Sequence, residues 1–190
     1  AIGTGAGPRT DGSNLARGQG VVCVSLNHRL GAMGYAYLGG FDDEFAHSGN
    51  QGQLDLILAL RWVRDNIEAF GGDPDRVMIH GESGGGGKIC TLLGMPKASG
   101  LYHRAILQSG TATRVPTKDT AATWAEEFLA ALGIDKANFR KVQDAPIEQI
   151  LKVQAEMELK ARGAYPRRGF VPTAGTPDLP LQPVDAVGTK

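Results

Sequence analysis

Three short apolar runs, at 21–26, 77–80 and 105–108, alternate with two stretches that suit helices. The run at 21–26 is rich in β-branched side chains and suggests a buried strand, as in a parallel sheet, and the runs at 77–80 and 105–108 are interpreted as the next two strands. The segments between them are long enough for helical crossovers, which parallel strands require. This alternation predicts an α/β fold built on a parallel sheet.

Residues 52–70 give the clearest helix, because apolar side chains recur every three or four positions and form one face. The positions of that face are Leu56, Leu60, Val63, Ile67 and Phe70. Two further helices are predicted at 119–132 and 146–160, the latter with Pro146 in its first turn. Their expected apolar sides are Trp124, Phe128, Leu129 and Leu132 in the first, and Ile147, Ile150, Leu151 and Met157 in the second. From residue 164 onward the chain is rich in proline and indicates a loop.

Composition excludes several classes of function. Lysine plus arginine equals aspartate plus glutamate at 20 each, so no net charge attracts the chain to nucleic acid or to an acidic membrane. No run reaches the roughly 18 apolar residues of a membrane span. The cysteines, Cys23 and Cys90, lie in apolar surroundings and are expected to be buried free thiols. Neither they nor the histidines have the spacing of metal ligands, so no metal site is expected.

Residues 81–85, Gly-Glu-Ser-Gly-Gly, match G-x-S-x-G between a predicted strand and a predicted helix. A serine at the tip of such a turn has a strained backbone, and glycines at 81 and 85 would prevent collisions with the neighbouring strand and helix. The N–H of Gly84, at the start of the helix, can donate to an oxyanion. Ser83 is therefore a candidate nucleophile, although a plain Gly-Ser turn fits the same residues.

The run 84–87 consists of four glycines. An interior glycine costs about 1 kcal/mol of helix stability relative to alanine, so four at a helix start conflict with local propensity, as happens at functional sites. A helix that begins only near Lys88 would remove this conflict. A phosphate-binding loop is disfavoured, because its pattern needs glycine where the chain has Glu82 and serine or threonine where it has Ile89.

Four runs of the chain resemble the type-B carboxylesterase family, which includes bacterial para-nitrobenzyl esterases and the cholinesterases. They are VVCVSLNHRLGAMGY, GNQGQLDLILALRWVRDNIEAFGGDPDRV, IHGESGG and GLYHRAILQSG. The later run FVPTAGTPDLPLQP also resembles a Pro-rich stretch of the family. The resemblance implies a partial α/β-hydrolase fold. Its expected parts are a core segment with the serine turn over 1–116, a helical lid-like region over 117–163 and a Pro-rich connecting loop over 164–190.

The resemblance implies a serine esterase that acts on a small-molecule ester without a cofactor. Ser83 would attack the ester and form an acyl-enzyme, while a histidine oriented by a carboxylate carries the proton. Gly84 would supply an oxyanion N–H, and Glu82 and Ser109 would lie close to the site. A purely structural, hydrogen-bonded carboxylate is an equally good reading of Glu82.

The resemblance also implies that parts of the site lie elsewhere. The family's upstream HGGG-type run and its downstream acid and histidine have no counterpart here, and none of the four histidines (His28, His47, His80 and His103) holds the triad position. The chain is therefore expected to be an internal fragment, truncated at both ends and with little or no activity alone. The alternative is a non-catalytic relative used for binding or adhesion, against which the retention of Ser83 argues. Compartment and oligomeric state stay open.

Overall fold

The computed structural model describes residues 4–8, 10–161 and 169–187. The helices and strands in chain order are α1 Ser13–Gln19, α2 Gly31–Tyr35, α3 Gln51–Asn66, β1 Met78–Glu82, α4 Gly84–Leu93, β2 Arg104–Gln108, α5 Lys118–Ala131, α6 Ile147–Lys160 and α7 Pro183–Val187. The 3₁₀ helices between them are η1 Asp43–Phe45, η2 Ser48–Asn50, η3 Ile67–Phe70, η4 Pro74–Arg76, η5 Pro96–Ala98 and η6 Lys136–Asp144.

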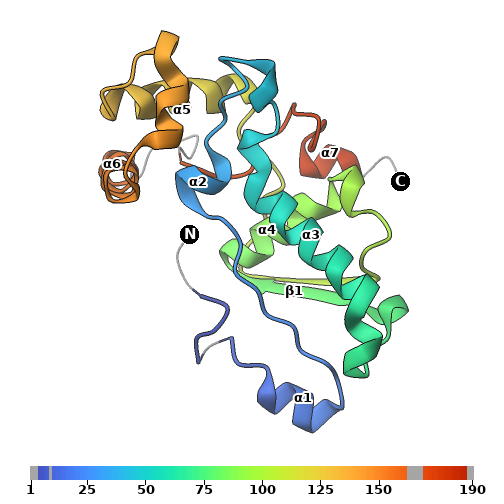
Figure 1. The fold of residues 1–190 in the computed structure, drawn as a ribbon. Helices are drawn as coiled ribbons and strands as arrows, with labels where there is room; N and C mark the ends of the chain where they lie inside the picture. Colours follow the sequence, from blue (N-terminus) through green and yellow to red (C-terminus); the bar gives the residue numbers. More distant parts are fainter. Residues whose placement is uncertain (1–3, 9, 162–168, 188–190) are drawn as a thin grey trace.

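A parallel β-α-β unit lies at the centre of the fold (Figure 1). β1 pairs with β2 in parallel, from Met78 opposite Arg104 to Glu82 opposite Gln108, and α4 connects them and packs against both strands. The parallel pairing predicted for 77–80 and 105–108 is thereby confirmed. The register places the carboxyl ends of the two strands side by side.

The expected third strand is not found. Residues 21–26 form neither a helix nor a strand, and the side chains of Val21, Val22, Cys23 and Val24 are exposed. The prediction of a buried strand with a buried Cys23 was wrong, because a strand also needs a neighbour for its N–H and C=O groups. Cys90, by contrast, is buried as expected.

The helix predicted at 52–70 forms as α3 followed by η3. Leu60, Val63 and Ile67 are buried as expected, but Phe70 is 61% exposed, and the most buried apolar residue of α3 is Ile57 at 2% exposure. The buried face thus runs through Ile57 and ends at Ile67. Phe70 instead lies against the half-exposed Trp62, with ring centroids 5.8 Å apart.

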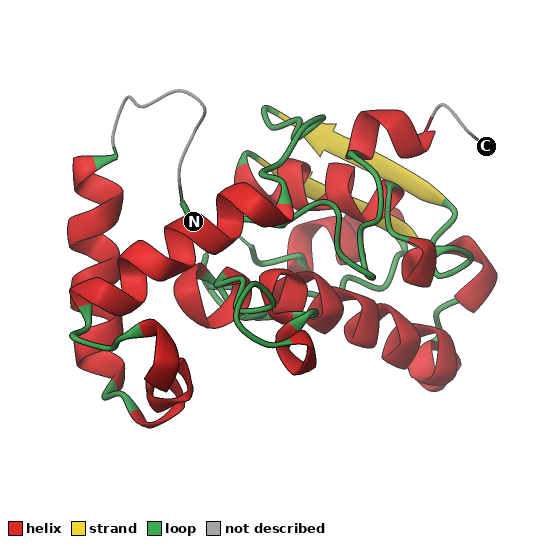
Figure 2. Ribbon diagram, turned by 90° about the horizontal axis from the view of Figure 1, so that it is seen from above, coloured by secondary structure: helices red, strands yellow, loops and turns green. Residues whose placement is uncertain are grey.

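The two later helices form as α5 and α6, at one end of the molecule and away from the strands (Figure 2). Trp124 and Phe128 of α5 pack with α6, α2 and Phe170 in one apolar cluster. On α6, Ile150 and Met157 are buried as expected and Val153 is buried with them, whereas Ile147 and Leu151 are exposed. Pro146 precedes the first turn instead of lying in it.

The segment 169–187 runs from this helical region back to α4, against which α7 packs. Leu179 is fully buried in the cluster formed with α3 and α4. The remainder of the predicted Pro-rich loop, including Arg167 and Arg168, lies outside the described residues. No helix of the described chain is both long and apolar enough to cross a bilayer.

Candidate active site

Ser83 occupies a strained turn between β1 and α4. Its backbone angles are φ 52° and ψ −112°, and it is exposed at the N-terminal cap of α4. A non-glycine residue in the left-handed region costs about 1–3 kcal/mol and persists only where its surroundings hold it. The described residues contain one other such case, Ser109, with φ 53°.

Hydrogen bonds hold the Ser83 backbone from two sides. Its N–H donates to the carbonyl of Gln108 at 2.7 Å, one step beyond the β1–β2 ladder. Its carbonyl accepts from the N–H of Gly87 at 3.1 Å, in the first turn of α4. Since α4 is helical from Gly84, the glycine run lies within the helix, and a helix that begins only near Lys88 is excluded.

The glycines around Ser83 differ in how much space a side chain would have. A Cβ on Gly81 would lie 2.6 Å from the carbonyl carbon of Gly85, so the strand and the helix meet there with no room for a side chain. A Cβ on Gly85 would meet no described atom within 4 Å. The collision expected at both positions is thus found at Gly81 and not at Gly85.

The structure gathers the other predicted site residues at the carboxyl edge of the sheet. Glu82 ends β1 opposite Gln108, and Ser109 follows directly after Gln108. Glu82 and Ser109 are both exposed. Gly84 is the first residue of α4, so its N–H has no partner within the helix. Ligands in α/β sheets bind at this edge.

Lys88 is a neighbour of this edge that sequence reasoning did not single out. It is half-buried, and its ammonium donates back to the carbonyl of Gly84 at 3.3 Å. Burial lowers the pKa of the Lys88 ammonium, because the charged form loses solvation. Nothing in the sequence marks this lysine, since its burial depends on the packing of α4.

None of the hydrogen bonds among the described residues joins the Ser83 hydroxyl to a histidine. The Nδ1 atom of His103 accepts from the N–H of Val77 at 3.2 Å, at the opposite end of the strands. His80 is exposed on β1. His28 is half-buried, and desolvation, with a smaller contribution from Lys88, lowers the pKa of its imidazole.

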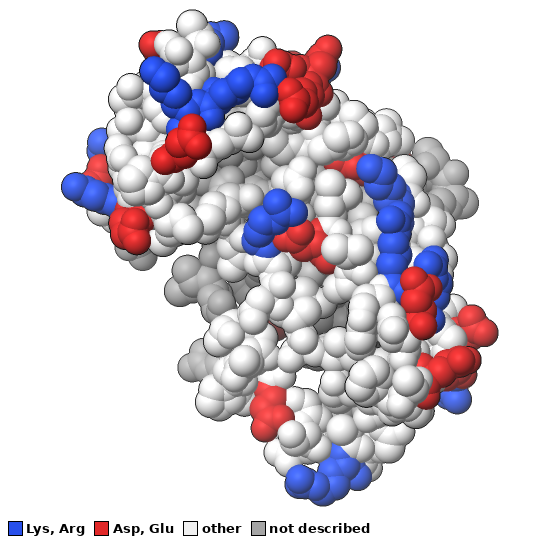
Figure 3. All heavy atoms as spheres, in the orientation of Figure 1, with Lys and Arg blue, Asp and Glu red and all other residues white. Residues whose placement is uncertain are grey.

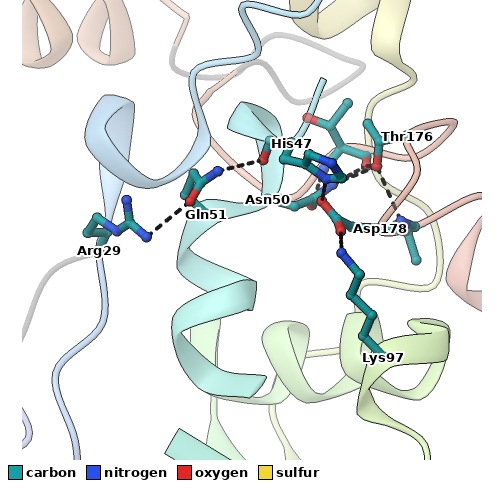
Figure 4. A network of polar contacts seen from close by, with 9 residues as sticks. Arg29, His47, Asn50, Gln51, Lys97, Thr176 and Asp178 are labelled. Carbon is teal, nitrogen blue, oxygen red and sulfur yellow. Dashed lines mark hydrogen bonds and ion pairs between the residues drawn. The ribbon is translucent and has the colours of Figure 1, made fainter. Parts of the chain in front are cut away.

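His47 is bonded to a buried carboxylate (Figure 4). Its Nδ1 lies 2.8 Å from Asp178, which is fully buried and also accepts from the Lys97 ammonium at 2.7 Å. Lys97 lies beyond the C-terminal end of α4, whereas Ser83 directly precedes the first residue of α4. Because a helix of 10 residues is about 15 Å long, the length of α4 separates Ser83 from Lys97. This His–Asp pair therefore anchors the segment around Asp178 and does not serve as the base for Ser83.

Within the described ranges, no three His, Cys, Asp or Glu side chains are grouped as a metal site would need. On the face shown in Figure 3, basic and acidic side chains are interspersed.

A strained serine between a parallel strand and a helix that begins at once has the geometry of the nucleophile elbow of α/β hydrolases. The model of the carboxylesterase family matches residues 1–189. The chain belongs to the carboxylesterase family.

Individual relatives agree with this assignment. Para-nitrobenzyl esterase of Bacillus subtilis is 41% identical over 186 residues, covering 98% of this chain and 37% of that protein. A probable N-octanoylanthranilate hydrolase of Rhodococcus erythropolis is 40% identical over 183 residues, covering 94% of this chain and 38% of that protein. The chain thus spans well under half the length of these relatives.

Solved structures of esterases share the fold. A thermophilic PNB esterase superimposes with a TM-score of 0.92 at 40% identity, covering 99% of this chain and 38% of that one. A carboxylesterase of Geobacillus stearothermophilus gives a TM-score of 0.85 at 34% identity, with 97% and 38% covered. The fold is therefore a part of the α/β-hydrolase fold, as the sequence predicts.

Proposed function

We propose that the protein carrying this chain is a serine carboxylic-ester hydrolase that acts through an acyl-enzyme on Ser83. The observation that carries the proposal is the strained Ser83 turn, followed directly by the Gly84 N–H, which as the first N–H of α4 has no partner within the helix. A relaxed Gly-Ser turn would need no such backbone.

In the proposed reaction the Ser83 Oγ attacks the carbonyl carbon of a small ester. The negative charge that develops on the carbonyl oxygen accepts a hydrogen bond from the Gly84 N–H, near the positive end of α4. The alcohol leaves with a proton, and water then releases the acid from Ser83. No hydrogen bond among the described residues joins the Ser83 hydroxyl to a histidine, and the proposal places the base that takes the serine proton outside this chain.

Glu82 and Ser109 flank Ser83 at the same sheet edge and are proposed to support it. The names of two relatives, an esterase and a probable N-acyl hydrolase, are consistent with acyl transfer to water. A small-molecule ester is the proposed substrate.

The test uses the intact protein that contains residues 1–190, with a short-chain para-nitrophenyl ester as substrate. Ser83→Ala should lower kcat/KM by about 10⁴-fold or more, as removal of a nucleophile does in serine hydrolases. A fluorophosphonate probe should label Ser83, identified by peptide mass spectrometry. The matched control is Ser99→Ala, because Ser99 is exposed and follows η5 at the far end of α4.

Folded wild-type protein that neither turns over the ester nor takes up the probe would contradict the proposal. That outcome would favour the non-catalytic binding or adhesion protein. Turnover that survives in Ser83→Ala would place the chemistry elsewhere.

A further inference from the structure

A second strained turn lies beside the nucleophile turn. Ser109, with its left-handed φ, directly follows Gln108 at the end of β2. Because Gln108 is opposite Glu82 in the sheet, Ser83 and Ser109 are the next residues beyond the paired ends of the two strands. Two strained residues at one edge indicate that the surrounding backbone fixes both turns together.

Gly110 is the residue of this second turn that touches Ser83. A Cβ on Gly110 would collide with the Ser83 carbonyl oxygen and would lie 2.6 Å from its carbonyl carbon and 3.0 Å from its Cα. All three atoms belong to the backbone, so no flexible side chain could move aside. The turn after β2 therefore packs directly on the peptide unit that follows Ser83.

Gly110 does not have the left-handed φ of its neighbour Ser109. Glycine is required at position 110 because a side chain would not fit, and not because the backbone adopts a conformation that favours glycine. An alanine at this position would change the contact with Ser83 without adding backbone strain of its own.

The start of α4 packs on the same turn. A Cβ on Gly86 would lie 2.5 Å from the carbonyl oxygen of Gly110 and 3.1 Å from that of Gln108. The nucleophile turn, the first turn of α4 and the turn after β2 thus meet through backbone alone. This arrangement gives a reason for glycine inside α4 that helix propensity alone does not provide.

The contact acts on the proposed oxyanion donor through the planarity of the peptide bond. In a trans peptide unit the C=O of Ser83 and the N–H of Gly84 lie in one plane and point in opposite directions. Any displacement of the Ser83 carbonyl therefore tilts the Gly84 N–H. We propose that Gly110 is a positioning residue, which aims the Gly84 N–H at the oxyanion by packing, without a side chain, against the Ser83 carbonyl. This inference rests on the proposed function of Ser83.

The experiment compares wild type, Gly110→Ala and Gly18→Ala in the intact protein that contains residues 1–190. Gly18 is the control, because an added Cβ there meets no described atom within 4 Å. Initial rates of para-nitrophenyl ester hydrolysis are divided by the number of competent sites, counted from the burst of nitrophenol. Gly110→Ala should lower kcat by about 10- to 100-fold, somewhat less than outright loss of one oxyanion donor. KM should stay within about twofold, since the donor acts on the transition state.

A second readout separates donor alignment from general loosening. Affinity for a trifluoromethyl ketone, which forms a tetrahedral adduct, should fall in Gly110→Ala by the same factor as kcat. Inhibition by the product acid, which needs no oxyanion, should not change. Gly86→Ala, which presses on Gly110 from the helix side, should shift both measurements in the same direction.

Several results would overturn the inference. One is a kcat per competent site within twofold of wild type in Gly110→Ala. Another is an equal loss of affinity for the ketone and the product acid. Failure of both glycine variants to fold would also contradict it, because the contact would then support the fold and not the donor. These outcomes differ from failure of the proposed function, in which Ser83→Ala keeps its activity or wild type has none.

Discussion

Close contacts between backbone segments hold the conformation of the Ser83 turn. The contact at Gly81 is the simplest of them to test. Alanine at Gly81 would place a methyl group 2.6 Å from the Gly85 carbonyl carbon, so β1 and α4 would have to separate. Overpacking of this kind costs about 1–3 kcal/mol of folding free energy. We expect Gly81→Ala to lower the unfolding free energy of the intact protein by that amount, measured by urea denaturation.

Gly18→Ala is the control for this prediction too, since Gly18 lies in α1 with open space around its Cα. It should not destabilise, because alanine is about 1 kcal/mol better than glycine in a helix. If Gly81→Ala changed stability by less than about 0.5 kcal/mol, the tight crossing of β1 and α4 would not exist in solution.

At the same scale, the sequence predicts part of the candidate site. The G-x-S-x-G pattern identifies Ser83 and Gly81 because the strand, the turn and the helix are contiguous in the chain. The role of Gly110 cannot be predicted in this way, because its contact with Ser83 depends on the register of β2 against β1. Ser109 was singled out by resemblance, but its left-handed backbone has no signal in the sequence.

At the scale of elements, local periodicity predicts helices well and lone strands poorly. α3 and α5 form where apolar spacing places them, because each helix satisfies its own backbone hydrogen bonds. The run 21–26 has the composition of a strand but remains exposed and unpaired among the described residues. Strand pairing is a long-range property, so composition indicates only the tendency.

The segment that follows this run is tied to α3 by one ion pair. The Asp55 carboxylate accepts from Arg29 Nη2 at 2.6 Å, from Arg29 Nε at 2.9 Å and from the Arg29 backbone N–H at 2.9 Å. The side-chain hydrogen bonds of Arg29 lower the pKa of the Asp55 carboxyl below its ordinary value of 3.8. The pair thus connects residues 21–30 to the core helix.

This pair predicts a stability difference that depends on pH. Because the pKa of Asp55 is depressed in the folded state, its contribution is present above the unfolded value and is lost as pH falls through the folded one. Asp55→Asn should cost about 1 kcal/mol at pH 7, since the pair is partly exposed. The cost should shrink steadily below pH 4, in urea denaturation of wild type and variant from pH 7 to pH 2.5.

Asp75→Asn is the matched control, because Asp75 is exposed and its carboxylate forms none of the hydrogen bonds described for this chain. Its effect should be small at every pH. A cost of Asp55→Asn that stays constant down to pH 2.5 would show that the charge of Asp55 does not stabilise the fold.

At the scale of the molecule, the two larger of three apolar clusters organise the described chain. One joins α2, α5, α6 and Phe170, and the other joins α3, α4 and the segment around Leu179. The first cluster combines residues from both sides of the predicted division at 116/117, so that division stays a prediction. The sheet at the centre consists of β1 and β2, with Met78 and Ile106 exposed on one face.

The activity of the 190-residue chain alone depends on which catalytic groups it holds. The described residues provide the Ser83 turn and the Gly84 N–H, none of their hydrogen bonds joins the Ser83 hydroxyl to a histidine, and the chain covers 37% of the Bacillus subtilis relative. The 190-residue chain alone should therefore show no saturable hydrolysis of a short aryl ester above the rate of its own Ser83→Ala variant. A chimaera in which the chain replaces the matching 186 residues of the Bacillus subtilis para-nitrobenzyl esterase should hydrolyse the ester.

The chimaera supplies the histidine and acid that the proposed mechanism places outside this chain, in the geometry of a family member whose fold the chain shares. The activity of the chimaera should therefore vanish in its Ser83→Ala variant. Circular dichroism of both proteins checks that loss of activity is not loss of fold. Saturable hydrolysis by the 190-residue chain alone, abolished by Ser83→Ala, would contradict the prediction and would mean that this chain holds its own base. In that case His80 and His28 would be the first candidates for the base, because the His47–Asp178 pair lies at the far end of α4 from Ser83.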